Sequence, residues 1–230
     1  MIEQILPPGV VGAEAFDDPA GLSALPAEEP IIGRAVEKRR REFITARHCA
    51  REALSQLGAD AGAIMRGEKG EPLWPRGVVG SITHTDGYRA AIVAYSMAVR
   101  SLGIDSEPHE ALPDGVLDHT SIAAERDVLA TRPAGLHWDR LLFCAKETTY
   151  KAWFPLTHRW LGFEDAHIVF EQTAGPSDGG SSPADGPASG TFTSTILIDG
   201  RTDDGGAPLL HLPGRWLIDQ GFITTTITLT

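Results

Sequence analysis

Two acidic residues, Asp105 and Glu107, follow an apolar stretch typical of a strand and could hold a divalent cation. Residues two apart in an extended chain point to the same side, so both carboxylates would face one spot. Mg²⁺ binds carboxylate oxygens of this kind together with waters and substrate phosphates. An Asp-x-Glu at a strand exit is more often a solvated turn, so this pair needs support from elsewhere in the chain.

A second charged group, Lys146, Glu147 and Lys151, lies in a segment predicted to be a helix over residues 138–154. Glu147 and Lys151 are four residues apart and share a helix face. As a surface ion pair they would contribute only about 0.3–0.5 kcal/mol. Apolar residues surround much of this helix, however, which indicates that its charges border a packed surface or a cleft. Both an ordinary structural ion pair and a functional role remain open.

Basic residues gather in the predicted helix 34–57, although the chain has a formal net charge of −11. Seven of the 20 lysines and arginines lie between Arg34 and Arg51. Four of them can line one side of the helix: Arg39, Arg40, Arg47 and Arg51. A local basic patch on an acidic protein suits a small polyanion, whereas the overall charge disfavours nucleic acid as the main partner. A solvated helix face is the alternative interpretation.

Two short segments could also contact a ligand. Lys69 and Gly70 lie in a loop rich in glycine, which lets the backbone approach a bound molecule. Ser81 and His84 lie where a predicted strand ends, although a lone histidine is more often structural. Neither the GxxxxGK[ST] nor the GxGxxG phosphate-binding pattern is present, which disfavours ATP- and NAD-type functions.

The predicted elements form two α+β halves, residues 1–103 and 104–230, each with one long helix and several strands. Thr173–Gly190, rich in glycine, proline and serine, separates two of the later strands and is expected to be a disordered loop. The predicted strands cover residues 78–83, 89–95, 98–105, 167–171, 191–199, 209–212, 215–219 and 222–229. A short strand is expected near Val10 and a short helix over residues 123–130.

The composition is that of an ordinary globular protein, with 42% hydrophobic and 22% charged residues over 230 positions. No apolar stretch is long enough to span a membrane, and Met1–Gly12 lacks the features of a signal peptide. We therefore expect a cytoplasmic protein. Cys49 and Cys144 form no zinc-ligand pattern and are expected to be buried free thiols.

Taken together, these segments resemble the phosphopantetheinyl transferases of the monomeric, two-halved type, in particular those of actinobacteria. The likeness runs from about Lys38 to Asp165. Its blocks are KRRREFITARHCAREAL, GEKGEPLWP, GSITHTDGYRAA, GIDSEPH, FCAKETTYKAWFPLT and RWLGFEDA. Their shared order and spacing make the resemblance specific. Residues 1–30 and Thr173–Gly190 lie outside it.

The resemblance implies a fold of two similar α/β halves related by a pseudo-twofold axis. Each half packs a long helix on a small, mainly antiparallel sheet, and the active site lies in the cleft between them. It also implies a reaction in which the phosphopantetheine arm of coenzyme A moves to a serine of a carrier protein, with Mg²⁺ as cofactor. The partners would be apo carrier proteins or domains of polyketide, nonribosomal peptide or fatty acid synthases.

The same resemblance implies roles for individual residues. Asp105, Glu107 and Glu147 match the family's metal ligands, and Glu147 would also be the catalytic base. Lys146 and Lys151 match the two lysines of its Lys-Glu-x-x-x-Lys motif, with Lys151 assisting catalysis and both contacting phosphates. The expected coenzyme A contacts in the first half are Arg39, Arg47, Lys69, Gly70, Ser81 and His84. Three consecutive arginines leave a choice between Arg39 and Arg40.

Two functions of other classes remain open. One is a non-catalytic regulator that binds coenzyme A. It would keep Arg39, Arg47 and Lys69 but could lack Glu147 and Lys151. The other is a magnesium-dependent phosphate-ester hydrolase built around Asp105 and Glu107. A nucleic-acid-binding module based on the basic helix is the weakest alternative because of the net charge.

Overall fold

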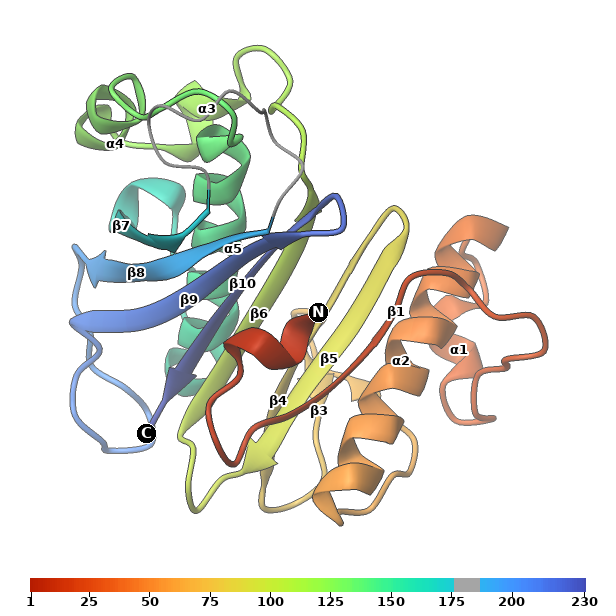
Figure 1. Cartoon of the computed structure of the whole chain (residues 1–230). Coiled ribbons are helices and arrows are strands. Elements are labelled where there is room, and N and C mark those ends of the chain that lie inside the picture. Colours follow the sequence, from red (N-terminus) through yellow and green to blue (C-terminus); the bar gives the residue numbers. More distant parts are fainter. Residues whose placement is uncertain (176–186) are drawn as a thin grey trace.

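A computed structural model describes residues 1–175 and 187–230 and has two halves, each with a long helix packed on an antiparallel sheet (Figure 1). This confirms the predicted α+β class. The helical elements are η1 (Ile2–Ile5), α1 (Glu29–Ile32), α2 (Glu37–Leu57), α3 (Val116–Thr120), α4 (Ala123–Leu129), α5 (Trp138–Thr157) and η2 (Phe163–Asp165). The strands are β1 (Val11–Ala15), β2 (Met65–Arg66), β3 (Pro72–Leu73), β4 (Val78–Thr85), β5 (Tyr88–Tyr95), β6 (Ser101–Pro108), β7 (Ala166–Ala174), β8 (Ala188–Ile196), β9 (His211–Asp219) and β10 (Phe222–Leu229).

The first half is a three-stranded sheet in the order β1-β5-β4 with α2 packed on it. Alternate side chains of its central strand, β5, point to opposite faces of the sheet, and both faces are buried. Ala91 and Val93 pack against the apolar side of α2, which includes Ala50 and Leu54. The intervening residues pack in a separate cluster with Leu102 and Ile104 of β6. One strand therefore contributes to the core of its own half and to the contact with the other half.

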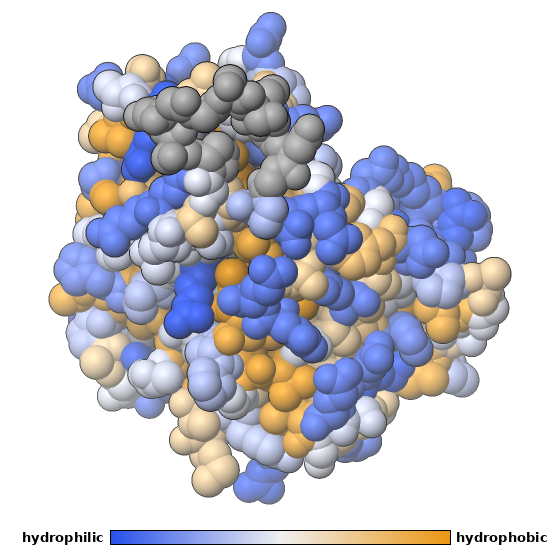
Figure 2. Space-filling model, viewed as in Figure 1, coloured by the Kyte–Doolittle hydropathy of each residue, from blue (hydrophilic) through white to orange (hydrophobic). Residues whose placement is uncertain are grey.

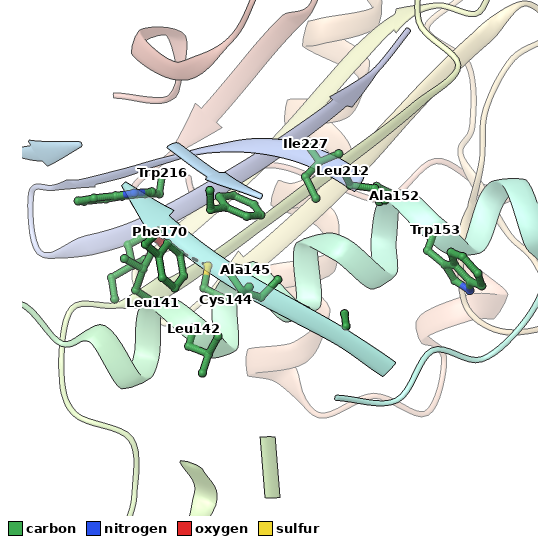
Figure 3. Packing of buried hydrophobic residues seen from close by; sticks show 14 of the residues in the cluster. Leu141, Leu142, Cys144, Ala145, Ala152, Trp153, Phe170, Leu212, Trp216 and Ile227 are labelled. Carbon is green, nitrogen blue, oxygen red and sulfur yellow. Dashed lines mark hydrogen bonds between the residues drawn. The ribbon is translucent and has the colours of Figure 1, made fainter. Parts of the chain in front are cut away.

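The second half is a five-stranded sheet in the order β6-β10-β9-β8-β7, and α5 lies on one face of it (Figure 1). Trp216 and Phe170 of the sheet pack in one hydrophobic cluster with Leu141 and Ala145 of α5 (Figure 3). Trp153, also in this cluster, is fully buried near the C-terminal end of the helix. This core fixes the position of α5 over the sheet.

The two sheets meet along β4 and β6, where side-chain hydroxyl groups of β4 accept hydrogen bonds from backbone amides of β6. Ser81 Oγ accepts a hydrogen bond from the Ile104 amide at 3.1 Å, and Thr83 Oγ1 accepts one from the Ser106 amide at 3.0 Å. All of β6 pairs with β10 of the second sheet. The predicted domain boundary between residues 103 and 104 therefore falls inside a strand of the second half.

Several predicted bounds shift by about three residues: α2 begins at 37 instead of 34, and β6 and β8 cover 101–108 and 188–196 instead of 98–105 and 191–199. In two further places packing overrides the local signals. α5 does not end at Phe154 but continues through Pro155 to Thr157, and the buried Leu156 extends its core face. The predicted strands 209–212 and 215–219 form the single strand β9. β10 pairs with β9 only as far as Gly214, so Pro213 has a neighbouring strand, β8, on one side only. A strand can accommodate proline at such a position because proline has no backbone N–H to donate.

The predicted loop Thr173–Gly190 is only partly described. Its first two residues belong to β7, and residues 188–190 belong to β8, so both ends are strand and not loop. The remainder includes residues 176–186, which lie outside the described part of the chain.

The surface in Figure 2 mixes hydrophilic and hydrophobic residues without a continuous apolar belt. Among the residues that the structure describes, no helix combines the length and apolar character needed to cross a bilayer. The cytoplasmic location stays a prediction.

Gly103 is the residue that lets α5 lie directly on β6. A Cβ atom at this position would stand 2.3 Å from the Thr148 carbonyl oxygen and 3.1 Å from Ala152 Cβ. We expect Gly103→Ala to lower the free energy of unfolding by about 1–3 kcal/mol, since the helix must move away from the strand. Urea denaturation measures this change.

Gly33→Ala is a matched control for that substitution. Its Cβ would lie 3.7 Å from the nearest carbonyl, an ordinary contact, and its backbone is right-handed helical. The control should be close to neutral. Equal losses in both variants would show that the close approach of α5 to β6 is not what Gly103 permits.

Candidate active site

Helix α5 and strand β6 bring four of the predicted residues to one edge of the second half. Glu147 and Lys151 lie on the side of α5 that faces β6, and Gly103 lets the two elements approach closely. Asp105 is 6% exposed, and its Oδ1 atom accepts a hydrogen bond from Lys151 Nζ at 2.7 Å. Glu107 follows on the same side of the strand. The sequence motifs thus meet in space.

Asp105 is held through one oxygen only. Its Oδ1 atom also accepts a hydrogen bond from Thr83 Oγ1 at 3.2 Å. The second oxygen, Oδ2, is buried and has no hydrogen-bond partner. A buried carboxylate oxygen without a partner is costly, so this atom is poised to accept a cation or a donor.

The neighbouring carboxyl groups are electrostatically linked to Asp105. Burial and the charge of Asp105 raise the pKa of Glu107, while its ion pair with Arg140 at 3.0 Å opposes the rise. Burial and the same Asp105 charge raise the pKa of Glu147, and Lys151 opposes it. Burial is the larger cause in both cases, and the mutual repulsion of the carboxylates adds to it; an added cation would offset both effects.

The donor types therefore fit Mg²⁺, which binds hard oxygen ligands. In the conformations described, however, Lys151 and Arg140 hold two of the three carboxylates. Across residues 1–175 and 187–230, no three acidic, histidine or cysteine side chains stand close enough together to bind a metal ion. Joint binding by Asp105, Glu107 and Glu147 stays a prediction.

A pocket of about 590 Å³ connects this edge to the first half of the chain. Glu147 and Lys151 form part of its wall on the α5 side. The predicted contacts that line it from the first half are Arg39, Arg47, Lys69, Gly70, Ser81 and His84. The pocket thus joins a carboxylate and a lysine of one half to a basic group of the other.

Two residues of the basic wall, Arg39 and Arg47, are arranged by α2. Arg39, Phe43 and Arg47 are spaced four apart and share one side of the helix. The Arg47 guanidinium lies over the Phe43 ring, 3.4 Å from its centroid, and Arg47 Nε donates to the Ile64 carbonyl at 3.0 Å. Burial lowers the pKa of Arg47 to about 10. Arg47 is therefore held rigidly in the wall of the pocket.

His84 is surrounded by cations. Arg39 Nη1 lies 2.5 Å from His84 Nε2, and the ring is 36% exposed. Partial burial, together with the positive charges of Arg39, Lys151, Arg89 and Arg47, lowers the pKa of His84 to about 3. The imidazole is therefore neutral near pH 7 and sits in a strongly positive field that favours an anion.

The two neighbouring arginines differ in where their side chains lie. Arg39 lines the pocket, whereas Arg40 donates to the Ile32 carbonyl and pairs with Glu29 at 3.1 Å. Arg40 therefore holds α1 against α2. Of these two arginines, Arg39 is the one that lines the pocket.

The remaining predicted contacts in the first half differ in character. Lys69 is exposed at the rim, and Gly70 adopts a positive φ of 99° that side chains rarely tolerate. Ser81 lines the pocket, but its hydroxyl already accepts the Ile104 amide. Lys69 is thus the cation of this group, and Ser81 contributes to the junction of the halves.

Lys146 is the predicted phosphate contact that the structure does not bring to the pocket. Its side chain is 1% exposed and pairs with Glu125 at 2.9 Å, and Nζ also donates to the Phe163 and Ala166 carbonyls. Successive residues on a helix are about 100° apart, so Lys146 leaves α5 on a different side from Glu147. The expected contact with phosphate is therefore replaced by a buried structural ion pair.

Two residues that bear on this site are absent from the predicted set. Arg140 lies seven residues before Glu147 on the same side of α5 and pairs with Glu107, a spacing that the helix period could have shown. Thr83 contacts Asp105 from β4, and nothing in the sequence signals that contact because it joins strands of different sheets.

Comparison with known proteins agrees with this arrangement. Residues 27–94 match the model of the 4'-phosphopantetheinyl transferase N-terminal domain, and residues 101–185 match that of the 4'-phosphopantetheinyl transferase superfamily. Together the two models cover both walls of the pocket.

Curated relatives match almost the whole chain. The 4'-phosphopantetheinyl transferase Npt of Nocardia iowensis is 60% identical over 99% of both chains. PptT of Mycobacterium tuberculosis is 58% identical over 94% of this chain and 91% of its own. Svp of Streptomyces mobaraensis is 43% identical over 99% of this chain and 88% of its own. The chain therefore belongs to the 4'-phosphopantetheinyl transferase superfamily and is an enzyme of this type.

Proposed function

We propose that this enzyme moves the phosphopantetheine arm of coenzyme A to a carrier-protein serine in the pocket between its two halves. One observation carries the proposal: Glu147 and Lys151 line the same cavity as Arg39, Arg47 and His84. A polyanion held by the basic wall would extend its pyrophosphate toward the acidic edge.

The basic wall is suited to the 3'-phosphate end of coenzyme A. Arg39 offers a planar guanidinium that can donate two parallel hydrogen bonds to a phosphate. Arg47 and Lys69 add positive charge, and neutral His84 can donate or accept one hydrogen bond. The apolar part of the pocket, formed by residues such as Trp74 and Phe154, suits the uncharged parts of the ligand.

The acidic edge is suited to a divalent cation. We propose that Asp105, Glu107 and Glu147 hold Mg²⁺, which when bound would neutralise pyrophosphate charge and polarise the phosphorus–oxygen bonds. The unpaired Oδ2 atom of Asp105 and the raised pKa values of the other two carboxyls support this assignment.

In the transfer, the carrier serine oxygen forms a bond to the β-phosphorus while the bond to the departing 3',5'-ADP breaks. Glu147 takes the serine proton, directly or through a water, and 3',5'-ADP leaves with the bonding electron pair. Lys151, which contacts Asp105 before ligand binding, balances the charge on the leaving group. The protein thus acts mainly by positioning and charge stabilisation.

The carrier partner is expected to be small and acidic, in polyketide, nonribosomal peptide or fatty acid synthesis. Because the enzyme carries a formal net charge of −11, overall attraction cannot bring the two together. Docking therefore depends on local basic or apolar surface near the pocket. We expect the enzyme to act as a monomer.

The decisive test is mass spectrometry of an apo carrier protein incubated with this enzyme, coenzyme A and Mg²⁺. We expect the carrier to gain the mass of one phosphopantetheine arm. Release of 3',5'-ADP without a carrier would indicate a hydrolase, and binding of coenzyme A without turnover would indicate a regulator.

In the same assay, Glu147→Gln should lower kcat by about 10²–10⁴-fold, because the amide cannot accept the serine proton. The substitution preserves size, so the melting temperature should stay close to that of the wild type. A near-native rate would remove Glu147 from the proposed proton transfer.

Arg39→Gln should raise KM for coenzyme A roughly tenfold, the size expected for one lost charge-assisted hydrogen bond. The effect on dephospho-coenzyme A should be much smaller because that ligand lacks the 3'-phosphate. Arg40→Gln is the matched control, since the neighbouring arginine pairs with Glu29 outside the pocket. Equal changes for both ligands would show that Arg39 does not contact the 3'-phosphate.

His84 should change its protonation behaviour when the pocket is filled. In the free enzyme the lowered pKa keeps the ring neutral, so its NMR signals should not titrate as pH falls from 8 to 5. Bound 3',5'-ADP offsets the nearby positive charges, and the pKa should rise. His84→Gln identifies the signals. Titration of the free enzyme near the ordinary value of 6.5 would contradict the expected cationic field.

A further inference from the structure

Asp105 receives both of its hydrogen bonds on the same oxygen. Lys151 Nζ and Thr83 Oγ1 donate to Oδ1 at 2.7 and 3.2 Å, and Oδ2 is buried without a partner. Within residues 1–175 and 187–230, only two other buried side-chain atoms lack a partner, Arg132 Nε and Ser194 Oγ. Asp105 Oδ2 is the one carboxylate oxygen among the three.

The direction of the Thr83 hydrogen bond is fixed by a second contact. Thr83 Oγ1 accepts a hydrogen bond from the Ser106 amide at 3.0 Å. Since a hydroxyl has a single proton, that proton remains available for Asp105 Oδ1. The Ser106 amide therefore donates to the Thr83 hydroxyl, and this hydroxyl donates to the Asp105 carboxylate. The two hydrogen bonds connect the carboxylate to the backbone of its own strand.

The Thr83 side chain is buried outside the lining of the ligand pocket. Thr83 is 2% exposed and does not line the cavity, although Ser81, Ile82 and His84 around it do. Its position on β4 instead joins the first half to β6. This residue is thus placed to act on Asp105 and not on a phosphate.

Lys151 and Thr83 hold Asp105 in different ways. Lys151 has a long flexible side chain, and in the proposed reaction its ammonium group moves toward the leaving group. Thr83 is branched at Cβ and buried, so its side-chain rotation is restricted. Thr83 can therefore keep the carboxylate in place when Lys151 turns to the ligand.

We propose that Thr83 is a positioning residue for the metal site, holding Asp105 by Oδ1 so that Oδ2 stays free to bind the cation. The proposal rests on the function proposed above, because it assumes that Asp105 is a metal ligand. Residues that orient a metal ligand commonly change metal affinity by about 10–100-fold when removed.

Binding of Mn²⁺ tests this role without turnover. The probe is Mn²⁺ at saturating coenzyme A without carrier protein, followed by electron paramagnetic resonance of the free ion. Thr83→Val, which replaces the hydroxyl by a methyl of similar size, should raise the Mn²⁺ dissociation constant about tenfold. Thr83→Ser should restore most of the affinity. Calorimetry in the presence of a chelator should show unchanged binding of coenzyme A to Thr83→Val.

Thr224→Val is the matched control. It removes a buried hydroxyl that bonds Ser106 Oγ at 2.9 Å in the same sheet without touching Asp105. Its Mn²⁺ affinity should equal that of the wild type. Thr83→Ala reports on the same hydroxyl should Thr83→Val fail to fold.

Two results would overturn the proposal. Unchanged Mn²⁺ affinity in Thr83→Val would show that Asp105 needs no positioning by the hydroxyl. Weaker coenzyme A binding in the presence of chelator would show that Thr83 contacts the ligand instead. Asp105→Asn tests the metal site separately from the role of Thr83. If this variant binds Mn²⁺ as tightly as the wild type, Asp105 is not a metal ligand and the proposed metal site fails. If only Asp105→Asn loses Mn²⁺, the metal site stands and the role of Thr83 falls.

Discussion

Two hydroxyl groups on β4 join the first half of this enzyme to the strand that carries its acidic residues. Ser81 and Thr83 accept the amides of Ile104 and Ser106, so the strands associate although they belong to different sheets. Each hydroxyl belongs to a strand of the first half and accepts a backbone amide of the second half, so it fixes the position of one strand relative to the other. The distance between the basic wall and the acidic edge of the pocket depends on this junction.

The charges around the pocket are balanced within the protein only in part. Lys151 neutralises one oxygen of Asp105, and Arg140 pairs with Glu107, yet the pKa values of Glu107 and Glu147 are raised. On the opposite wall, burial together with several nearby cations lowers the pKa of His84 and keeps its ring neutral. Each wall thus carries an excess of one sign. A ligand that combines a phosphate at one end with a cation-bound pyrophosphate at the other would satisfy both.

Local patterns predicted the elements well and their contacts less well. The long helices, most strands and the residues that line the pocket follow from periodicity and from family motifs. Contacts between strands of different sheets, such as Thr83 with Asp105, leave no periodic signal. Core packing extended α5 past Pro155, where the local signal is a helix stop. The choice of Arg39 over Arg40 needed the direction in which each side chain leaves α2.

The two lysines of the Lys-Glu-x-x-x-Lys segment show why a motif need not gather all of its residues at one site. Lys146 is tied to Glu125, which also accepts the amides of Ile122 and Ile168. A buried lysine is costly unless it is paired, so this contact resists rotation of α5 about its axis. Rotation by one residue would turn Glu147 and Lys151 away from β6. Lys146 thus supports the pocket from another side of the helix. Its ion pair with Glu125 lies outside the pocket and keeps Glu147 and Lys151 facing Asp105.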